Sequence, residues 1–171
     1  MSIHENLVDI EKSITKLNRS GKYDGEKLSA SLKHLTSQLE FFYCHLLSET
    51  KEDHETYYSI PLKPKEHQLA YFNIGRGFPK ELMDGHYCYI LKDLGYKSVV
   101  IPCTSIKNND KPHKGYEMDI NIKINGQNNK SRLQFTDIRT VDNQRLDLRK
   151  SFWEVTTSRS KILNEVKKIL F

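Results

Sequence analysis

The first 46 residues carry the pattern that most constrains this chain, because their apolar side chains recur at alternating steps of four and three. Such steps place side chains along one stripe of a helix. The two stripes are Ile3, Leu7, Ile10, Ile14 and Leu17, and then Leu28, Leu32, Leu35, Leu39, Phe42 and Leu46. Between them Gly21 can end a first helix and Asp24 can cap a second one. The pattern therefore predicts a helical hairpin.

The hydrophobic pattern changes near residue 60 from helical spacing to short strand-like runs. The change follows the polar run Ser48–Thr56 and coincides with Pro61 and Pro64. Residues 1–60 hold 7 Lys and Arg against 10 Asp and Glu, a net charge of −3, whereas residues 61–171 hold 20 against 12, a net charge of +8. We therefore expect a hairpin extension over 1–60 and a separate domain over 61–171. Basic charge spread through a folded domain favours nucleic acid as a partner, although a lysine-rich surface also aids solubility.

The second part of the chain reads as short strands followed by a helix. Strands are predicted at His67–Asn73, His86–Lys92, Lys97–Pro102, Glu117–Ile124 and Arg132–Phe135, separated by turn-rich stretches. From about Ser158 the apolar residues return to helical spacing. The expected class is α+β, mainly β: a small barrel-like domain closed by a C-terminal helix.

Several functional classes are excluded by what the sequence lacks. No apolar run approaches the roughly 20 residues that span a bilayer, and the N-terminus has no signal-peptide core, so we expect a soluble, cytoplasmic protein without membrane contact. The histidines show no metal-binding spacing and Gly75–Gly77 is no phosphate loop, so neither a metal nor a cofactor is expected. The three cysteines form no CxxC pair and are interpreted as small buried hydrophobes.

Three segments, in this order, resemble the PemK/MazF family of type II toxin–antitoxin ribonucleases over roughly residues 67–171. They are Gly85–Leu91, Val99–Ser105 and Asp137–Leu146, the last being the most specific. The resemblance implies an SH3-like barrel with a C-terminal helix. It also implies a homodimer that acts as a sequence-selective endoribonuclease on single-stranded mRNA, needs no metal and is held inactive by a cognate antitoxin. The cut would leave a 2′,3′-cyclic phosphate or 3′-phosphate and a 5′-hydroxyl.

The resemblance also nominates catalytic residues. Thr104 and Ser105 match hydroxyl positions that contact the scissile phosphate, whereas the other interpretation of these two residues is the capping of a turn. Ungapped alignment places His86 where the family carries an Arg, and Tyr87 where it carries a Pro. Histidine titrates near neutral pH and can act as a general acid or base, or it can be a rim residue held by a backbone group.

RNA-binding candidates are Arg76, Arg139 and Lys107. Arg76 lies in the loop before the second strand, where the resemblance implies contact with RNA. Arg139 can equally brace the barrel through an ion pair. Thr136 stands where some relatives carry a catalytic carboxylate, so that group is absent there.

Two further possibilities stay open. Without the family's Arg and carboxylate, the barrel could be a non-catalytic or attenuated toxin that binds RNA or a protein target such as gyrase. The acidic hairpin could cover the basic groove, dock an antitoxin or form a dimer surface. Trp153 is interpreted as packing, with stacking on a base as the alternative.

Overall fold

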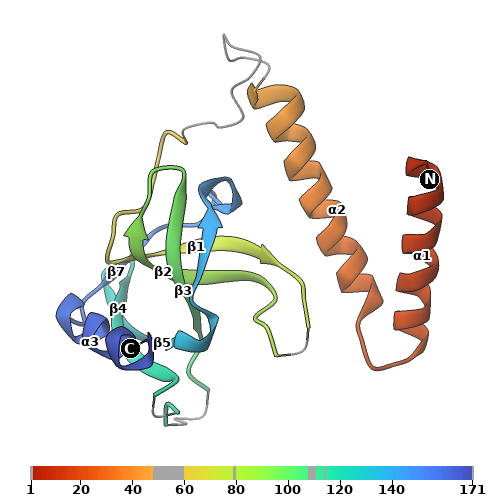
Figure 1. Ribbon diagram of the computed structural model, residues 1–171. Helices are drawn as coiled ribbons and strands as arrows, with labels where there is room; N and C mark the ends of the chain where they lie inside the picture. Colours follow the sequence, from red (N-terminus) through yellow and green to blue (C-terminus); the bar gives the residue numbers. More distant parts are fainter. Residues whose placement is uncertain (1, 48–59, 79, 108–110, 114, 171) are drawn as a thin grey trace. The chain divides into compact units, whose positions relative to one another are not determined.

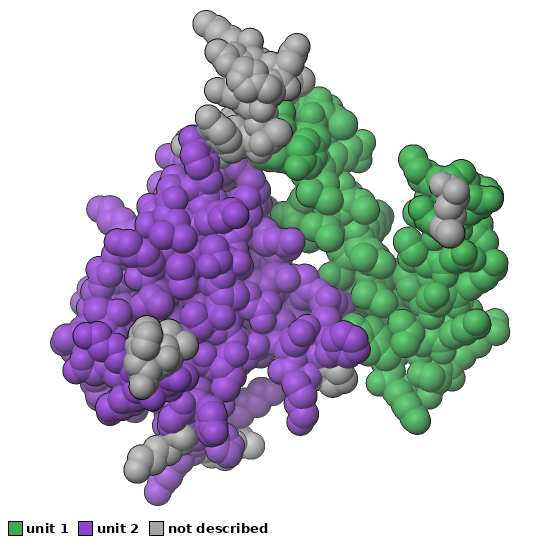
Figure 2. Space-filling model, viewed as in Figure 1, with its two compact units in different colours: residues 1–56 green, residues 57–171 purple. Residues whose placement is uncertain are grey.

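The computed structural model describes residues 2–47, 60–78, 80–107, 111–113 and 115–170. The chain divides into two compact units, residues 1–56 and 57–171, which are coloured separately in Figure 2. The polar run Ser48–Thr56, where the sequence places the change of hydrophobic pattern, lies outside the described residues. In the described part, no helix is long and apolar enough to cross a membrane.

The first unit is the predicted helical hairpin, formed by α1 (Ile3–Arg19) and α2 (Gly25–Phe41). Ser2 and Glu5 form a capping box at the start of α1, and the Lys27 amide donates to Asp24 Oδ1 at 2.9 Å at the start of α2. A short π-helix, η1 (Phe42–Leu46), continues α2 and was not predicted.

The two helices meet closely only at their turn. The Gly25 amide donates to Asn18 Oδ1 at 3.2 Å, and a Cβ at Gly25 would lie 2.7 Å from the Asn18 Cβ, so only glycine allows this approach. Away from the turn the helices diverge (Figure 1), and apolar exposure rises from 39% at Leu17 to 81% at Ile3. The hairpin therefore forms from its pattern without burying its stripes.

The second unit is α+β, as predicted, and contains a closed six-stranded antiparallel barrel (Figure 1). Its strands follow one another in the order β2-β1-β7-β4-β5-β3, and β3 pairs back with β2 to close the ring. The short strand β6 pairs with the first half of β3 outside the ring. The elements are β1 (Gln68–Gly75), β2 (Asp84–Asp93), β3 (Lys97–Thr104), β4 (Glu117–Ile124), β5 (Gln127–Gln134), η3 (Phe135–Asp137), β6 (Arg139–Asp142), η4 (Asn143–Arg145), β7 (Trp153–Val155) and α3 (Arg159–Leu170).

The β4–β5 connection corrects the sequence interpretation. The predicted strands Glu117–Ile124 and Arg132–Phe135 leave residues 125–131 as a turn-rich stretch, but the turn is only Asn125 and Gly126, with φ of 50° and 80°, and β5 begins at Gln127. Positive φ at both central residues is typical of the two-residue hairpin turn that Asn-Gly favours. The first half of β5 is polar because its side chains are exposed, which hid it from a hydrophobic pattern.

Two apolar clusters hold the second unit together. The interior cluster fills the barrel and includes Leu69, Tyr89 and Ile101 from β1, β2 and β3, and α3 adds Ile162 and Val166. The outer cluster lies on the opposite face of the same three strands, where the segment after β5 covers it; its members include Phe72, Ile90, Val100, Val141 and Leu146. Strands β1, β2 and β3 are therefore buried on both faces over much of their length.

Candidate active site

The apolar outer face of β2 and β3 becomes polar toward the end of β3. Cys88 pairs with Pro102, and both are buried. Because side chains alternate between faces, the same register continued by two residues sets His86 level with Thr104 on this outer face. The Nδ1 atom of His86 lies 3.2 Å from the carbonyl oxygen of Cys103, which agrees with that placement.

The same line of side chains continues across the next two strands. Thr104 is paired with Arg132 of β5, and Arg132 is paired with Asp119 of β4. Residues directly opposite each other in a sheet share a face, so these side chains are neighbours. We call this line the polar row; it consists of His86, Thr104, Arg132 and Asp119.

His86 is held at both ring nitrogens by backbone carbonyl groups. Its Nδ1 faces the Cys103 oxygen at 3.2 Å, and its Nε2 faces the Met83 oxygen at 3.0 Å. A neutral imidazole donates from one nitrogen, whereas an imidazolium donates from both. The geometry matches the rim histidine held by the backbone, and His86 can exchange a proton with a substrate only after releasing one carbonyl.

Arg132 is the central charge of the polar row, and its exposed fraction is only 7%. Its Nε and Nη2 donate to the two carboxylate oxygens of Asp119 at 2.6 and 3.1 Å, and its Nη1 lies 3.6 Å from Glu117 Oε2. Bidentate pairs of this kind fix the guanidinium plane. One cation beside two carboxylates gives this cluster both a charged hydrogen-bond donor for a negative oxygen and potential proton acceptors.

Thr104 has its hydroxyl oriented by a neighbour. Gln134 Nε2 donates to Thr104 Oγ1 at 3.0 Å, which leaves the hydroxyl proton of Thr104 available to donate elsewhere. Ser105 and Lys107 follow the strand and are exposed. The structure thus places His86 and Thr104 on neighbouring strands of one face, with Ser105 next in the chain.

The two predicted RNA-binding arginines are each paired with a carboxylate of this chain. Arg76 donates from Nε and Nη2 to Asp84 at 2.7 and 2.8 Å, and its side chain is 9% exposed. Arg139 Nη2 lies 3.3 Å from Asp137 Oδ1, which is the bracing ion pair that the sequence left open. Contact with RNA stays a prediction for Arg76, Arg139 and Lys107.

The segment between β1 and β2 is tied to the barrel beside the polar row. The Leu82 amide donates to Asp137 Oδ1 at 3.4 Å, and the Met83 carbonyl faces His86. At the base of the segment, Arg76 and Asp84 form the bidentate pair described above. Release of His86 from Met83 requires either rotation of the imidazole ring or a shift of this segment.

Arg132 and its carboxylates were missed by sequence reasoning, although a signal for them existed. Once the turn is placed at Asn125 and Gly126, residues equidistant from it must face each other, and this pairs Arg132 with Asp119. The sequence interpretation placed a longer loop there and so could not derive the pairing.

The cysteines differ from one another. Burial raises the pKa of the Cys103 thiol to about 12 and raises that of Cys88 well above its usual value, so neither is a ready nucleophile. Cys44 is exposed, which corrects the prediction that all three are buried. Among the described residues, no three His, Cys, Asp or Glu side chains gather as a metal site would require.

Trp153 packs within the barrel end. Its ring stacks on Tyr87 with centroids 3.4 Å apart, and Tyr87 in turn meets Tyr71 edge to face at 5.3 Å. Trp153 and Tyr87 also contact the interior cluster. These contacts favour the packing role over base stacking.

Comparison with known protein families finds no match, and comparison with curated proteins finds none either.

Proposed function

We propose that the chain is a metal-independent endoribonuclease that cuts single-stranded RNA, as the PemK/MazF toxins that it resembles do. The observation that carries the proposal is the polar row, which gathers an imidazole, a hydroxyl, a guanidinium and a carboxylate on one face of the barrel. The net charge of +8 over residues 61–171 supports a polyanionic substrate. An SH3-like toxin barrel, an antitoxin partner and a cytoplasmic location belong to the same proposal.

The proposed reaction begins when a phosphate oxygen of the RNA takes the place of Asp119 on Arg132. Asp119 is then free to accept the proton of the ribose 2′-hydroxyl, and the 2′-oxygen attacks phosphorus. Arg132 and the Thr104 hydroxyl donate to the oxygens that gain charge. The bond from phosphorus to the 5′-oxygen breaks as His86, in its imidazolium form and released from the Met83 carbonyl, gives that oxygen the proton of Nε2 and becomes a neutral imidazole. This leaves a 2′,3′-cyclic phosphate and a 5′-hydroxyl.

The test is incubation of the full chain with a long unstructured RNA, with EDTA or with magnesium, followed by analysis of the cut ends. The variants are His86→Ala, Thr104→Ala and Arg132→Met. His34→Ala and Thr140→Ala are matched controls, because both residues are exposed and lie outside the polar row. Loss of a general acid or of a charge-stabilising donor lowers the rate by roughly 100-fold or more.

The expected result is cutting in EDTA with 5′-hydroxyl ends, which the three polar-row variants lose and the two controls keep. Ends that carry a 5′-phosphate, or a strict requirement for magnesium, contradict the proposal. Thermal unfolding of each variant separates loss of chemistry from loss of fold.

A second candidate is a barrel that binds RNA or a protein target such as gyrase without cutting. Two observations favour it: both nitrogens of His86 face backbone carbonyls, and the charge of Arg132 is matched by Asp119 and Glu117. RNA that stays intact while it binds the protein, in an assay where a metal-independent ribonuclease cuts it, supports this candidate instead.

A further inference from the structure

The apolar stripes of the hairpin are only partly covered in the described structure. Six stripe positions are exposed, and the other five, which are half-buried, are Ile14, Leu28, Leu35, Phe42 and Leu46. No residue of α1 is buried, and in α2 only Gly25 is. Leu7 on α1 and Leu39 on α2 are 58% and 46% exposed, although both lie within regular stripes. Exposed apolar surface of this regularity marks an interaction surface.

Both stripes follow the four-three spacing of a heptad repeat, in which the positions beside the stripe decide which partners are accepted. On α1 these flanking positions include His4, Asn6, Glu11 and Ser13, among which Glu11 is the one carboxylate and none is Lys or Arg. A flank with few charges sets up little repulsion against a copy of itself.

The flanking positions of α2 carry even less charge than those of α1. They include Ser29, Ser31, Thr36 and Gln38, which carry hydroxyl and amide groups only. In a symmetric pair of identical chains each surface meets itself, so like charges at the flanks would oppose association. A partner of different sequence is usually selected by charged flanks, which α2 does not offer at these positions.

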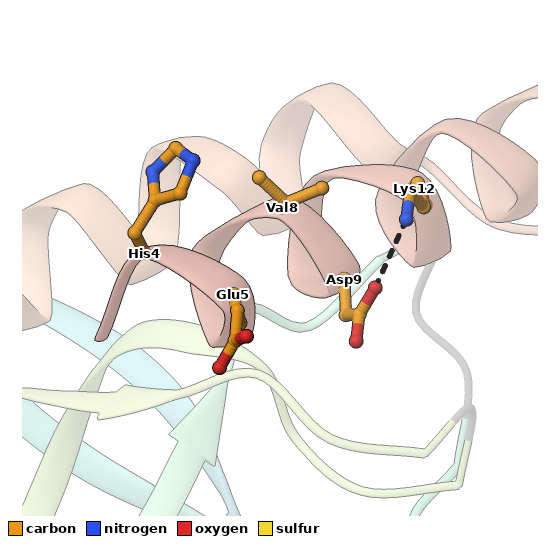
Figure 3. Close-up of a pocket in the computed structure, with 5 residues that line it drawn as sticks. All are labelled: His4, Glu5, Val8, Asp9 and Lys12. Carbon is orange, nitrogen blue, oxygen red and sulfur yellow. Dashed lines mark hydrogen bonds and ion pairs between the residues drawn. The ribbon is translucent and has the colours of Figure 1, made fainter. Parts of the chain in front are cut away.

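The charges of α1 lie mainly on another face of the helix. An open hollow there is lined by His4, Glu5, Val8, Asp9 and Lys12, all on α1 (Figure 3). Lys12 Nζ pairs with Asp9 Oδ1 at 3.1 Å, and both side chains are well exposed. This polar face can stay in water while the stripe is covered.

We propose that two copies of this chain associate through the hairpin stripes, so that α1 and α2 of each copy form one four-helix bundle with those of the other. The stripes of one copy then cover those of its partner around a two-fold axis. The uncharged flanks make an identical chain the fitting occupant. The inference is independent of the proposed ribonuclease activity.

The test is sedimentation of the full chain over a range of micromolar concentrations, together with Leu7→Lys and Leu39→Lys. Leu62→Lys is the matched control, because Leu62 is 59% exposed and lies in the other unit. Each dimer carries the substitution twice, so the dissociation constant should rise on the order of 100-fold or more.

We expect a wild-type dimer, a dimer for Leu62→Lys and monomers for both hairpin variants. Circular dichroism must show unchanged helix content in the variants at a dilution where the wild type is monomeric, which separates lost association from lost folding. A wild type that is monomeric throughout overturns the proposal. So does a dimer that survives both hairpin substitutions, since its interface then lies elsewhere.

Discussion

The hairpin and the barrel both carry regular apolar patterns, but only the barrel buries the apolar side chains fully. Every stripe position of α1 leaves some apolar surface in water, whereas Leu69, Tyr89 and Ile101 in the barrel are fully buried. Two helices offer each other one line of contact, but a ring of strands encloses a volume and adds a second core outside it. Burial in this chain therefore comes from closure of a ring, and a regular pattern alone does not provide it.

The largest contrast that we predict is in thiol reactivity. Cys44 on the hairpin should react with a disulfide reagent as an ordinary exposed thiol, whereas Cys88 and Cys103 react only when the barrel opens. Opening of a stable core makes labelling slower by on the order of 1,000-fold or more. The measurement is the time course of labelling, and Cys44→Ser should abolish its fast phase. A second fast thiol would show that the barrel is not closed.

The next largest contrast is in the free energy of unfolding lost when one leucine is truncated in each region. Leu133→Ala removes a fully buried side chain from the interior cluster and should lower the free energy of unfolding by about 2–5 kcal/mol. Leu7→Ala, the same chemical change at an exposed site, should cost less than about 0.5 kcal/mol in the monomer. Urea unfolding of dilute protein measures both. Equal losses would mean that the hairpin stripe is covered.

Removal of one ion pair in each region should give a smaller difference in the free energy of unfolding. Arg132→Met leaves Asp119 and Glu117 without their cation and should destabilise the barrel by about 2 kcal/mol, less than for a fully buried pair because Asp119 is partly exposed. Lys12→Met removes the exposed pair with Asp9, where a loss of about 0.5 kcal/mol or less is expected. Urea unfolding compares the two. The idea fails if Arg132→Met is as stable as the wild type.

The smallest contrast that we predict is between Glu66 and an exposed carboxylate, and it depends on pH. Its carboxylate accepts from Arg159 Nη2 at 2.5 Å and from the Asp93 amide, and these bonds, with Lys92 nearby, lower its pKa from 4.5 to about 2. The stabilisation is complete above about pH 4.5 and is lost as the pH falls toward 2. Glu66→Gln should cost about 1 kcal/mol at neutral pH, since the pair is partly exposed.

Urea unfolding near pH 7 and near pH 3 measures this effect, with Glu154→Gln as a control at an exposed carboxylate. The difference between wild type and Glu66→Gln should shrink in acid. A difference that grows in acid would give Glu66 the opposite role.

Much of the fold could be predicted from the sequence because most helices and strands have a recognisable pattern within their own residues. The hairpin has regular stripes with Gly21 and Asp24 between them, and the apolar strands have short hydrophobic runs. Strands β6 and β7 were missed because their four and three residues are too short to show alternation. The exposed half of β5 was missed because it carries no hydrophobic pattern.

The candidate site was predictable only in part. His86 and Thr104 were nominated by resemblance, and the structure places them on adjacent strands, with His86 Nδ1 3.2 Å from the carbonyl oxygen of Cys103, which precedes Thr104. The assignment of Arg132 to the site requires knowing which residues face each other across strands, and that register follows from the position of a turn. Arg76 and Arg139 illustrate the reverse case, because the sequence shows a cation but not the carboxylate that it pairs with.

The two-residue turn at Asn125 and Gly126 also bears on the order in which the barrel folds. Strands β4 and β5 are adjacent in sequence, and so are β2 and β3, so each pair can form a local hairpin within microseconds. The pairing of β3 with β5 joins segments that are distant in sequence and must wait for both. Arg132 and Asp119 would thus meet early, in a local hairpin. His86 and Thr104 belong to the other local hairpin, and the two hairpins meet when β3 pairs with β5, so the complete polar row exists only after that long-range pairing has formed.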